Sequence, residues 1–187
     1  MIKKYLKEQA GRSMIEAIGY ISIMITITVS LTAAVNSGYH RFRLGRINQQ
    51  VVDLKKVISQ RYVAAENFVG VKFDTLINEK IVPHEVRDKK HAFGGDITIG
   101  KGDEDGKTYY IQFDDLPTQA CVELGSKLWI TNDGSDLDAL TINNKKTWAW
   151  KYSIYEGTPD YELPAKPTDV AEVCNASSEN TIKWYFN

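Results

Sequence analysis

The stretch that decides the fold runs from residue 15 to residue 35 and reads IEAIGYISIMITITVSLTAAV. As a helix, these roughly 21 residues would be about 30 Å long, which matches the hydrocarbon core of a bilayer. In its inner part, from Ile21 to Thr32, apolar residues alternate mostly with Ser and Thr, a period of two that favours a strand in a soluble protein. A lone strand would leave backbone groups unpaired in lipid, whereas a helix bonds its own backbone and lets each hydroxyl bond to the preceding turn. The stretch therefore predicts a membrane-spanning helix.

Charge on the N-terminal side of this stretch sets its orientation. Lys3, Lys4 and Lys7 stand there with a single acidic residue, Glu8. The cytoplasmic flanks of membrane helices carry an excess of Lys and Arg. We therefore expect the N-terminus to lie in the cytoplasm and the rest of the chain to lie on the outer side of the membrane.

After the apolar stretch, apolar residues recur at spacings of three and four, as in a helix with one apolar face. The positions are Ile47, Val51, Leu54, Ile58, Tyr62, Ala65 and Val69. The simplest account is one continuous helix from about residue 13 to residue 68. We expect lipid to surround its first part and its second part to be amphipathic.

Two ordinary explanations compete for the N-terminal segment. A secretory signal peptide would be cut near Ala33 or Ala34 and would release a soluble domain, whereas an uncleaved signal anchor would keep the whole span. Neither explains the carboxylate of Glu16 at the mouth of an apolar run, where a charge is costly. Neither explains why Gly11 stands five residues before it.

The segment Gly11-Arg12-Ser13-Met14-Ile15-Glu16 resembles the cleavage site of type IV prepilins. The peptidase of that family cuts after a glycine on the cytoplasmic side and leaves the apolar helix on the mature protein, whose fifth residue is usually glutamate. The resemblance implies cleavage between Gly11 and Arg12, with Glu16 as the fifth residue. The family usually has an apolar or aromatic residue in place of Arg12, which leaves N-methylation of the new amine open.

The resemblance also implies a role for Glu16 in assembly. In the family, this glutamate pairs with the N-terminal amine of a neighbouring subunit. Two opposite charges that share an apolar bundle each remove the other's need for water. The plainer interpretation is a carboxylate that reaches from the start of the helix to the lipid headgroups.

The rest of the chain predicts a compact α+β head. Turn residues, prolines and alternating apolar runs mark its short elements. The expected elements are a helix at 74–80 before Pro83, a tight passage at 93–95, strands at 96–100 and 107–113 around a turn at 101–106, a helix after Pro117, a hairpin of 138–142 and 146–150 across Asn143-Asn144, a helix after Pro167 and a strand at 181–186.

The order of these elements resembles that of type IVb pilins, including the thin-pilus pilins of conjugative systems. The resemblance rests on Val82-Pro83, the FGG turn at 93–95, LPTQACVEL around Cys121, and Cys174 just before the last strand. It implies the type IV pilin fold, in which a long N-terminal α-helix, membrane-spanning and then amphipathic, packs on a small antiparallel β-sheet head. The implied divisions are a leader at 1–11, a transmembrane or filament-core helix at 12–35, its amphipathic continuation at 36–69 and the globular head at 70–187.

The two cysteines, Cys121 and Cys174, form one possible pair and cannot by themselves build a structural zinc site. Thiols oxidise outside the cytoplasm, where the predicted topology places the head. We therefore expect a disulfide between Cys121 and Cys174.

Other chemistry finds little support in the sequence. A net charge of -1 gives no basic field for nucleic acid. The acidic turns at 103–106 and 133–136 offer oxygen ligands for calcium, but neither matches EF-hand spacing, so solvated turns are the preferred interpretation. No nucleophile, base and orienting group can be placed together, and no phosphate loop is present. We expect no enzyme activity, no cofactor and no metal site.

The sequence thus predicts a structural pilin subunit, processed by prepilin peptidase and polymerised through its N-terminal helix into a type IV pilus. Its expected partners are the peptidase, other copies of the subunit, the inner-membrane assembly machinery and the membrane itself. The subunit would wait in the inner membrane with its head in the periplasm, and it would end in an extracellular pilus. The role of that pilus stays open among adhesion, conjugation, motility and secretion.

Two alternatives to a major subunit stay open. The alternative within the class is a minor pilin or a type II secretion pseudopilin, which primes or tips a filament. From another class, it is a signal-anchored periplasmic binding domain whose ligand face is the aromatic set Trp148, Trp150, Tyr152 and Tyr155. Such a tether needs neither the spacing of Gly11 and Glu16 nor an amphipathic helix after the span.

Overall fold

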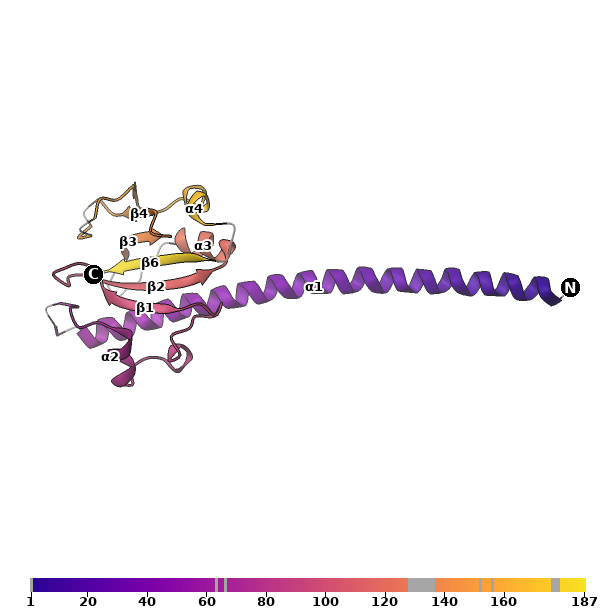
Figure 1. Ribbon diagram of the computed structural model, residues 1–187, viewed down its shortest axis with the longest axis horizontal. Coiled ribbons are helices and arrows are strands. Elements are labelled where there is room, and N and C mark those ends of the chain that lie inside the picture. Colours follow the sequence, from indigo (N-terminus) through magenta and orange to yellow (C-terminus); the bar gives the residue numbers. More distant parts are fainter. Residues whose placement is uncertain are drawn as a thin grey trace. The chain divides into compact units, whose positions relative to one another are not determined.

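The computed structural model describes residues 2–62, 64–65, 67–127, 137–151, 153–155, 157–175 and 179–187, with the backbone alone at 2–13 and 33. The chain divides into two compact units, Met1–Phe42 and Arg43–Asn187. Helix α1 (Ile2–Tyr62) contributes to both units (Figure 1). The second unit is the α+β head.

In its described part, the head is built on one six-stranded sheet with the order β1-β2-β6-β3-β4-β5 (Figure 1). Neighbouring strands are antiparallel except β4 and β5, which are parallel. The last strand, β6, lies between β2 and β3, so the C-terminal segment joins the two predicted hairpins into one sheet. The strands are β1 (Ile97–Lys101), β2 (Tyr109–Leu116), β3 (Leu137–Ile142), β4 (Lys146–Ala149), β5 (Tyr161–Glu162) and β6 (Asn180–Phe186).

The part of α1 that belongs to the head packs into the core through one apolar side. Ile47, Val51, Leu54 and Ile58 are fully buried there. They share one cluster with the inward-facing residues of the central strands, among them Ile111, Phe113, Ile182, Trp184 and Phe186. The predicted amphipathic repeat is therefore confirmed over these four positions.

The predicted bounds of the long helix are wrong at both ends. The helix begins at Ile2 instead of near residue 13, and it ends at Tyr62 instead of near residue 68. Beyond Tyr62 the Ala65 N–H donates to the Tyr62 carbonyl at 2.9 Å in a turn, and the Phe68 N–H donates to the Gly106 carbonyl at 2.6 Å, which bonds this segment to the β1–β2 turn. Val69, expected on the apolar face, is half exposed.

Shorter helices surround the sheet where the prolines predicted them. The helix expected at 74–80 is α2 (Phe73–Asn78), followed by a 3-10 turn at His84–Val86. Pro117 directly precedes α3 (Thr118–Gly125), and α4 (Pro167–Val173) begins at its proline. Gly125 is required where α3 meets its neighbours, because a Cβ there would lie 2.8 Å from Ile142 and 2.9 Å from Val170.

His91 fixes the predicted FGG turn at 93–95. Its Nδ1 accepts the Phe93 N–H at 3.1 Å, and its Nε2–H donates to the Asp114 carbonyl, so these partners assign the tautomer. Gly95 passes so close to β2 that a Cβ would overlap the Asp114 carbonyl oxygen. The turn is also bonded to α1, since the Ala92 N–H donates to Gln50 Oε1 at 3.2 Å.

The same environment keeps His91 neutral. Burial lowers the pKa of His91 and outweighs the hydrogen bond to Asp114, which raises it. A protonated ring would also lose the Nδ1 acceptor that holds Phe93.

We therefore expect the head to lose stability in mild acid. As pH falls below about 6.5, the unfolded chain takes up the proton first, because the folded-state pKa is depressed. His91→Gln should flatten this fall in the free energy of unfolding between about pH 7.5 and pH 5, and denaturant titrations followed by tryptophan fluorescence will measure it. His84→Gln, at an exposed position, is the matched control and should keep the wild-type slope. Equal slopes in all three proteins would exclude His91 as the cause.

Candidate functional site

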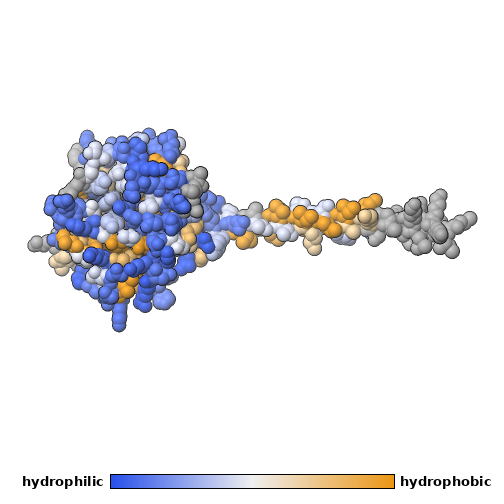
Figure 2. All heavy atoms as spheres, in the orientation of Figure 1, coloured by the Kyte–Doolittle hydropathy of each residue, from blue (hydrophilic) through white to orange (hydrophobic). Residues whose placement is uncertain are grey.

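The first unit carries an apolar surface that none of its described side chains covers. Met14, Ile15 and Tyr20 expose 69–73% of their surface, and the large apolar residues that follow up to Val35 are also exposed. On the face that Figure 2 presents, apolar residues gather over this stretch of α1. Among the described helices, α1 is the one with the length and composition to cross a membrane. An apolar surface of this size marks a contact with lipid or protein.

The hydroxyl side chains of this stretch bond to their own helix, as predicted. Each of the five Ser and Thr hydroxyls with a bond in the structure donates to the carbonyl four residues earlier, so these hydroxyl protons need no water or external partner. The bonds are Ser22 to Ile18, Thr26 to Ser22, Thr28 to Met24, Ser30 to Thr26 and Thr32 to Thr28, all at 2.8–2.9 Å. Satisfied hydroxyls make the helix compatible with an apolar surrounding on all sides.

A shallow groove of about 370 Å³ runs along the same stretch. Two rows of residues spaced by four border it, Tyr20-Met24-Thr28 and Ile21-Ile25-Val29. Rows of this spacing are the ridges between which a ridge of another helix packs. The surface therefore suits contact with a second helix as well as with lipid.

Glu16 stands at the N-terminal end of one of these rows, one turn before Tyr20. Its side chain is exposed, and none of the described side chains pairs with it. Gly11 and Arg12 lie in the helical part that precedes it, where the structure describes the backbone alone. The structure thus places the three residues in one helix, and their roles in cleavage and assembly stay predictions.

The head holds the disulfide expected between Cys121 and Cys174. Their Sγ atoms lie 2.01 Å apart and their Cα atoms 6.0 Å apart, across a separation of 53 residues. Cys121 belongs to α3, and Cys174 directly follows α4. Both are buried, so the bond fixes the two helices to each other inside the core.

A pair of asparagines completes this junction, which sequence reasoning missed. Asn180 is fully buried and donates to the carbonyls of Leu116 and Asn175, at 3.0 and 3.3 Å. Its Oδ1 accepts from Asn143 Nδ2 at 3.0 Å, and Asn143 donates to Val173 at 2.9 Å. The bonds join β6 and the β3–β4 turn to the last residue of β2 and to the end of α4. A polar residue at the start of an apolar strand was the available signal.

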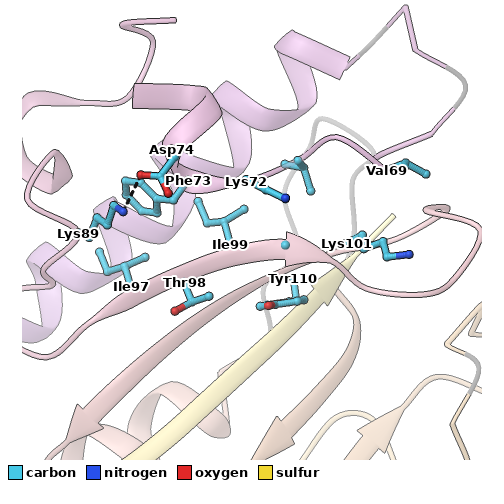
Figure 3. Close-up of a pocket in the computed structure, with 12 residues that line it drawn as sticks. Val69, Lys72, Phe73, Asp74, Lys89, Ile97, Thr98, Ile99, Lys101 and Tyr110 are labelled. Atoms are coloured by element: carbon cyan, nitrogen blue, oxygen red, sulfur yellow. Dashed lines mark ion pairs between the residues drawn. The ribbon is translucent and has the colours of Figure 1, made fainter. Parts of the chain in front are cut away.

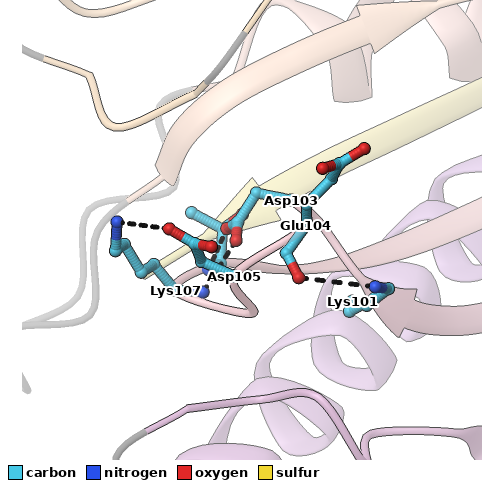
Figure 4. A network of polar contacts seen from close by, with 6 residues as sticks. Lys101, Asp103, Glu104, Asp105 and Lys107 are labelled. Carbon is cyan, nitrogen blue, oxygen red and sulfur yellow. Dashed lines mark hydrogen bonds and ion pairs between the residues drawn. The ribbon is translucent and has the colours of Figure 1, made fainter.

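The acidic turn at 103–106 uses its first carboxylate internally (Figure 4). Asp103 accepts hydrogen bonds from the Lys107 N–H, the Thr108 N–H and the Thr108 hydroxyl. Burial raises the pKa of Asp103, but these hydrogen bonds outweigh it and hold the pKa below its ordinary value. The carboxylate thus stabilises the turn, and the other acidic turn, at 133–136, lies outside the described residues.

The aromatic set does not form one exposed face in the described part of the chain. Trp148 is fully buried in the core, and Trp150 donates its Nε1–H to the Leu137 carbonyl at 2.7 Å. Tyr155 lies on the opposite face of the sheet against Tyr185, with ring centroids 5.0 Å apart. Tyr152 lies outside the described residues. These positions favour packing roles for the three described rings.

Comparisons with known proteins agree with this architecture. A family model described as PilS N terminal matches residues 44–187, and no curated protein matches the chain by sequence. The chain is similar to the crystal structure of TcpA, a type IV pilin from Vibrio cholerae El Tor biotype, with a TM-score of 0.55 and 12% identity. The match covers 77% of this chain and 98% of that chain. The predicted type IV pilin fold is therefore confirmed, and the type IVb subclass stays a prediction.

Removing the disulfide should destabilise the head strongly. For a closed loop of this length, the chain-entropy model gives about 4 kcal/mol, so Cys121→Ala with Cys174→Ala should lower the free energy of unfolding by roughly that amount. Hydrogen exchange should rise first at 157–166, a segment rich in turn residues inside the closed loop. Reductant added to the wild type is the matched control and should have the same effect. Unchanged stability would show that the bond contributes nothing.

Proposed function

The chain belongs to the PilS N-terminal family, and from that premise we propose that it is a structural subunit of a type IV pilus. In this proposal, prepilin peptidase removes residues 1–11 and the mature subunits polymerise through their N-terminal helices. The subunit has no catalytic role, cofactor or metal. The family match and the type IV pilin fold support this assignment.

The observation that carries the proposal is the exposed apolar surface of α1 between residues 14 and 35. Lipid can cover it before assembly, with the head on the periplasmic side of the inner membrane. A bundle of equivalent helices can cover it afterwards, in an extracellular filament. Because both surroundings are apolar, the transfer between them exposes little new surface to water if the inner-membrane assembly machinery moves the subunit directly.

In this proposal, Glu16 sets the register of the subunit in the bundle. In lipid its carboxylate lies near the helix start, where headgroups and water are within reach. In a bundle it meets the amine that cleavage creates on Arg12 of a neighbouring subunit. The pair neutralises both charges in an apolar surrounding, whereas one charge left alone there costs about 3–5 kcal/mol. A subunit shifted along the bundle leaves both charges unpaired, so the pair selects one axial position.

We expect the mature protein to begin at Arg12, because Gly11 and the short basic leader match the prepilin pattern. Intact-mass analysis of protein from the cell envelope will measure the start, and Gly11→Val is the matched variant that should keep the leader. A chain that begins at Met1 would support the uncleaved anchor, and one that begins near Val35 would support a secreted domain.

Glu16→Ala should leave the subunit stable in the membrane and reduce its incorporation into filaments by more than about tenfold, since the amine loses its partner. Immunoblots of sheared filaments and of membranes will measure the two pools. Glu172→Ala, at an exposed position on α4, is the control and should assemble normally. Mutant filaments at normal yield would remove the registry role, and a trace amount of wild type in sheared filaments would indicate a minor pilin.

A further inference from the structure

Strand β1 is the outer strand of the sheet and leaves backbone groups on its far side. It pairs with β2 alone among the described strands. The Asp114 N–H donates to Asp96, and the Gly102 N–H donates to Thr108, so the even-numbered residues bond toward β2. In an antiparallel pair the residues between them direct their N–H and C=O groups the other way. The backbone N–H and C=O groups of Ile97, Ile99 and Lys101 therefore point away from β2.

One of these outward groups is already used. The Ile97 N–H donates to the Lys89 carbonyl at 2.7 Å. No described segment bonds to the outward groups of Ile99 and Lys101. An unpaired strand edge of this kind is a template for another strand.

A groove of about 570 Å³ lies along this open edge (Figure 3). Its apolar lining comes from Val71, Phe73, Ile97 and Ile99, all of them buried. The segment 69–74 forms the facing wall, as Figure 3 shows. The open hydrogen-bonding groups and the apolar lining therefore share one concave site.

The rim of the groove is positively charged. Lys72 and Lys101 are exposed, and the side chain of Lys72 has no ion-pair or hydrogen-bond partner among the described residues. Lys101 has only a 3.5 Å contact with the Glu104 carbonyl. The carboxylate of Asp74 is engaged with Lys89, at 2.6 Å. Two lysines thus remain for an acidic partner.

We propose that this groove binds an extended acidic peptide, which adds to the sheet as a further strand beside β1. The backbone of Ile99 and Lys101 supplies the hydrogen bonds, the apolar lining receives alternate side chains, and Lys72 and Lys101 select carboxylates. Strand addition of this kind takes affinity from the backbone and specificity from alternate side chains. The occupant is a segment of another protein with acidic and apolar residues in alternation.

The site follows from the head alone and does not depend on polymerisation. Binding is therefore measured on the monomeric full-length chain in detergent micelles, and a failure of filament assembly would leave the result unaffected.

The probe is a blocked, fluorescein-labelled peptide with the sequence TEVEVET, and fluorescence anisotropy measures its binding. Two further peptides carry N-methyl groups, one on its valines and the other on its glutamates. Only one of these two sets directs its N–H groups to β1 in an added strand. We expect one N-methylated peptide to bind at least about tenfold more weakly and the other to bind like the parent. Weaker binding of the peptide that is N-methylated on its valines would indicate an antiparallel added strand. Weaker binding of the peptide that is N-methylated on its glutamates would indicate a parallel one.

Charge is tested separately. Lys72→Glu with Lys101→Glu should weaken binding of TEVEVET by about tenfold, and the peptide TKVKVKT should not bind the wild type. Lys56→Glu, at an exposed position on α1 outside the groove, is the matched control and should bind like the wild type. The proposal is overturned if TEVEVET does not bind, if both N-methylated peptides behave alike, or if TKVKVKT binds equally well. These peptide comparisons decide the question even if the double variant does not fold.

Discussion

The apolar surface of α1 between residues 14 and 35 has to be covered at every stage of the protein's existence. Its Ser and Thr hydroxyls are bonded to their own helix, so apart from Glu16 and the Tyr20 hydroxyl this stretch presents hydrocarbon and satisfied polar groups. Water is the one surrounding that such a surface excludes. Lipid and a bundle of similar helices satisfy it equally, and in the proposed function this equivalence lets one segment act first as an anchor and then as an assembly element.

In the head, the same helix α1 buries one apolar side in a hydrophobic core. From residue 44 onward the apolar residues fall on one side, and Ile47, Val51, Leu54 and Ile58 bury that side in the core of the head. The Cys121–Cys174 bond links α3 to the end of α4, and the Asn143–Asn180 pair links β6 and the β3–β4 turn to the end of α4. The head is therefore fixed internally by its own core and cross-links, so its folding does not depend on what covers residues 14–35.

The sequence predicted the features that local patterns determine, such as helix faces and turns. It did not predict the features that depend on pairing between distant strands. Spacing in α1 predicted its buried row, and Asn143-Asn144 predicted a turn that both residues occupy at positive φ. The place of β6 between β2 and β3 could not be predicted, because strand order depends on contacts distant in sequence. β5 was missed because Tyr161 and Glu162 are two exposed residues without an alternating pattern. The open edge of β1 can be recognised only when the strand order is known, so the groove beside it had no signal in the sequence.

The lysines beside β1 bear on how an open edge is tolerated in a protein that the proposed filament would hold at high local concentration. Lysine at an edge opposes pairing with an identical edge, because the two copies bring like charges together and desolvate them. Lys72 and Lys101 thus work against association of one β1 edge with another, and the same charges favour a strand that carries carboxylates. An edge that was only to be blocked could be closed by a proline or a bulge, which would remove the donors. β1 keeps the outward donors of Ile99 and Lys101 and lines the space beside them with apolar residues, a combination that discriminates between strands instead of rejecting all of them.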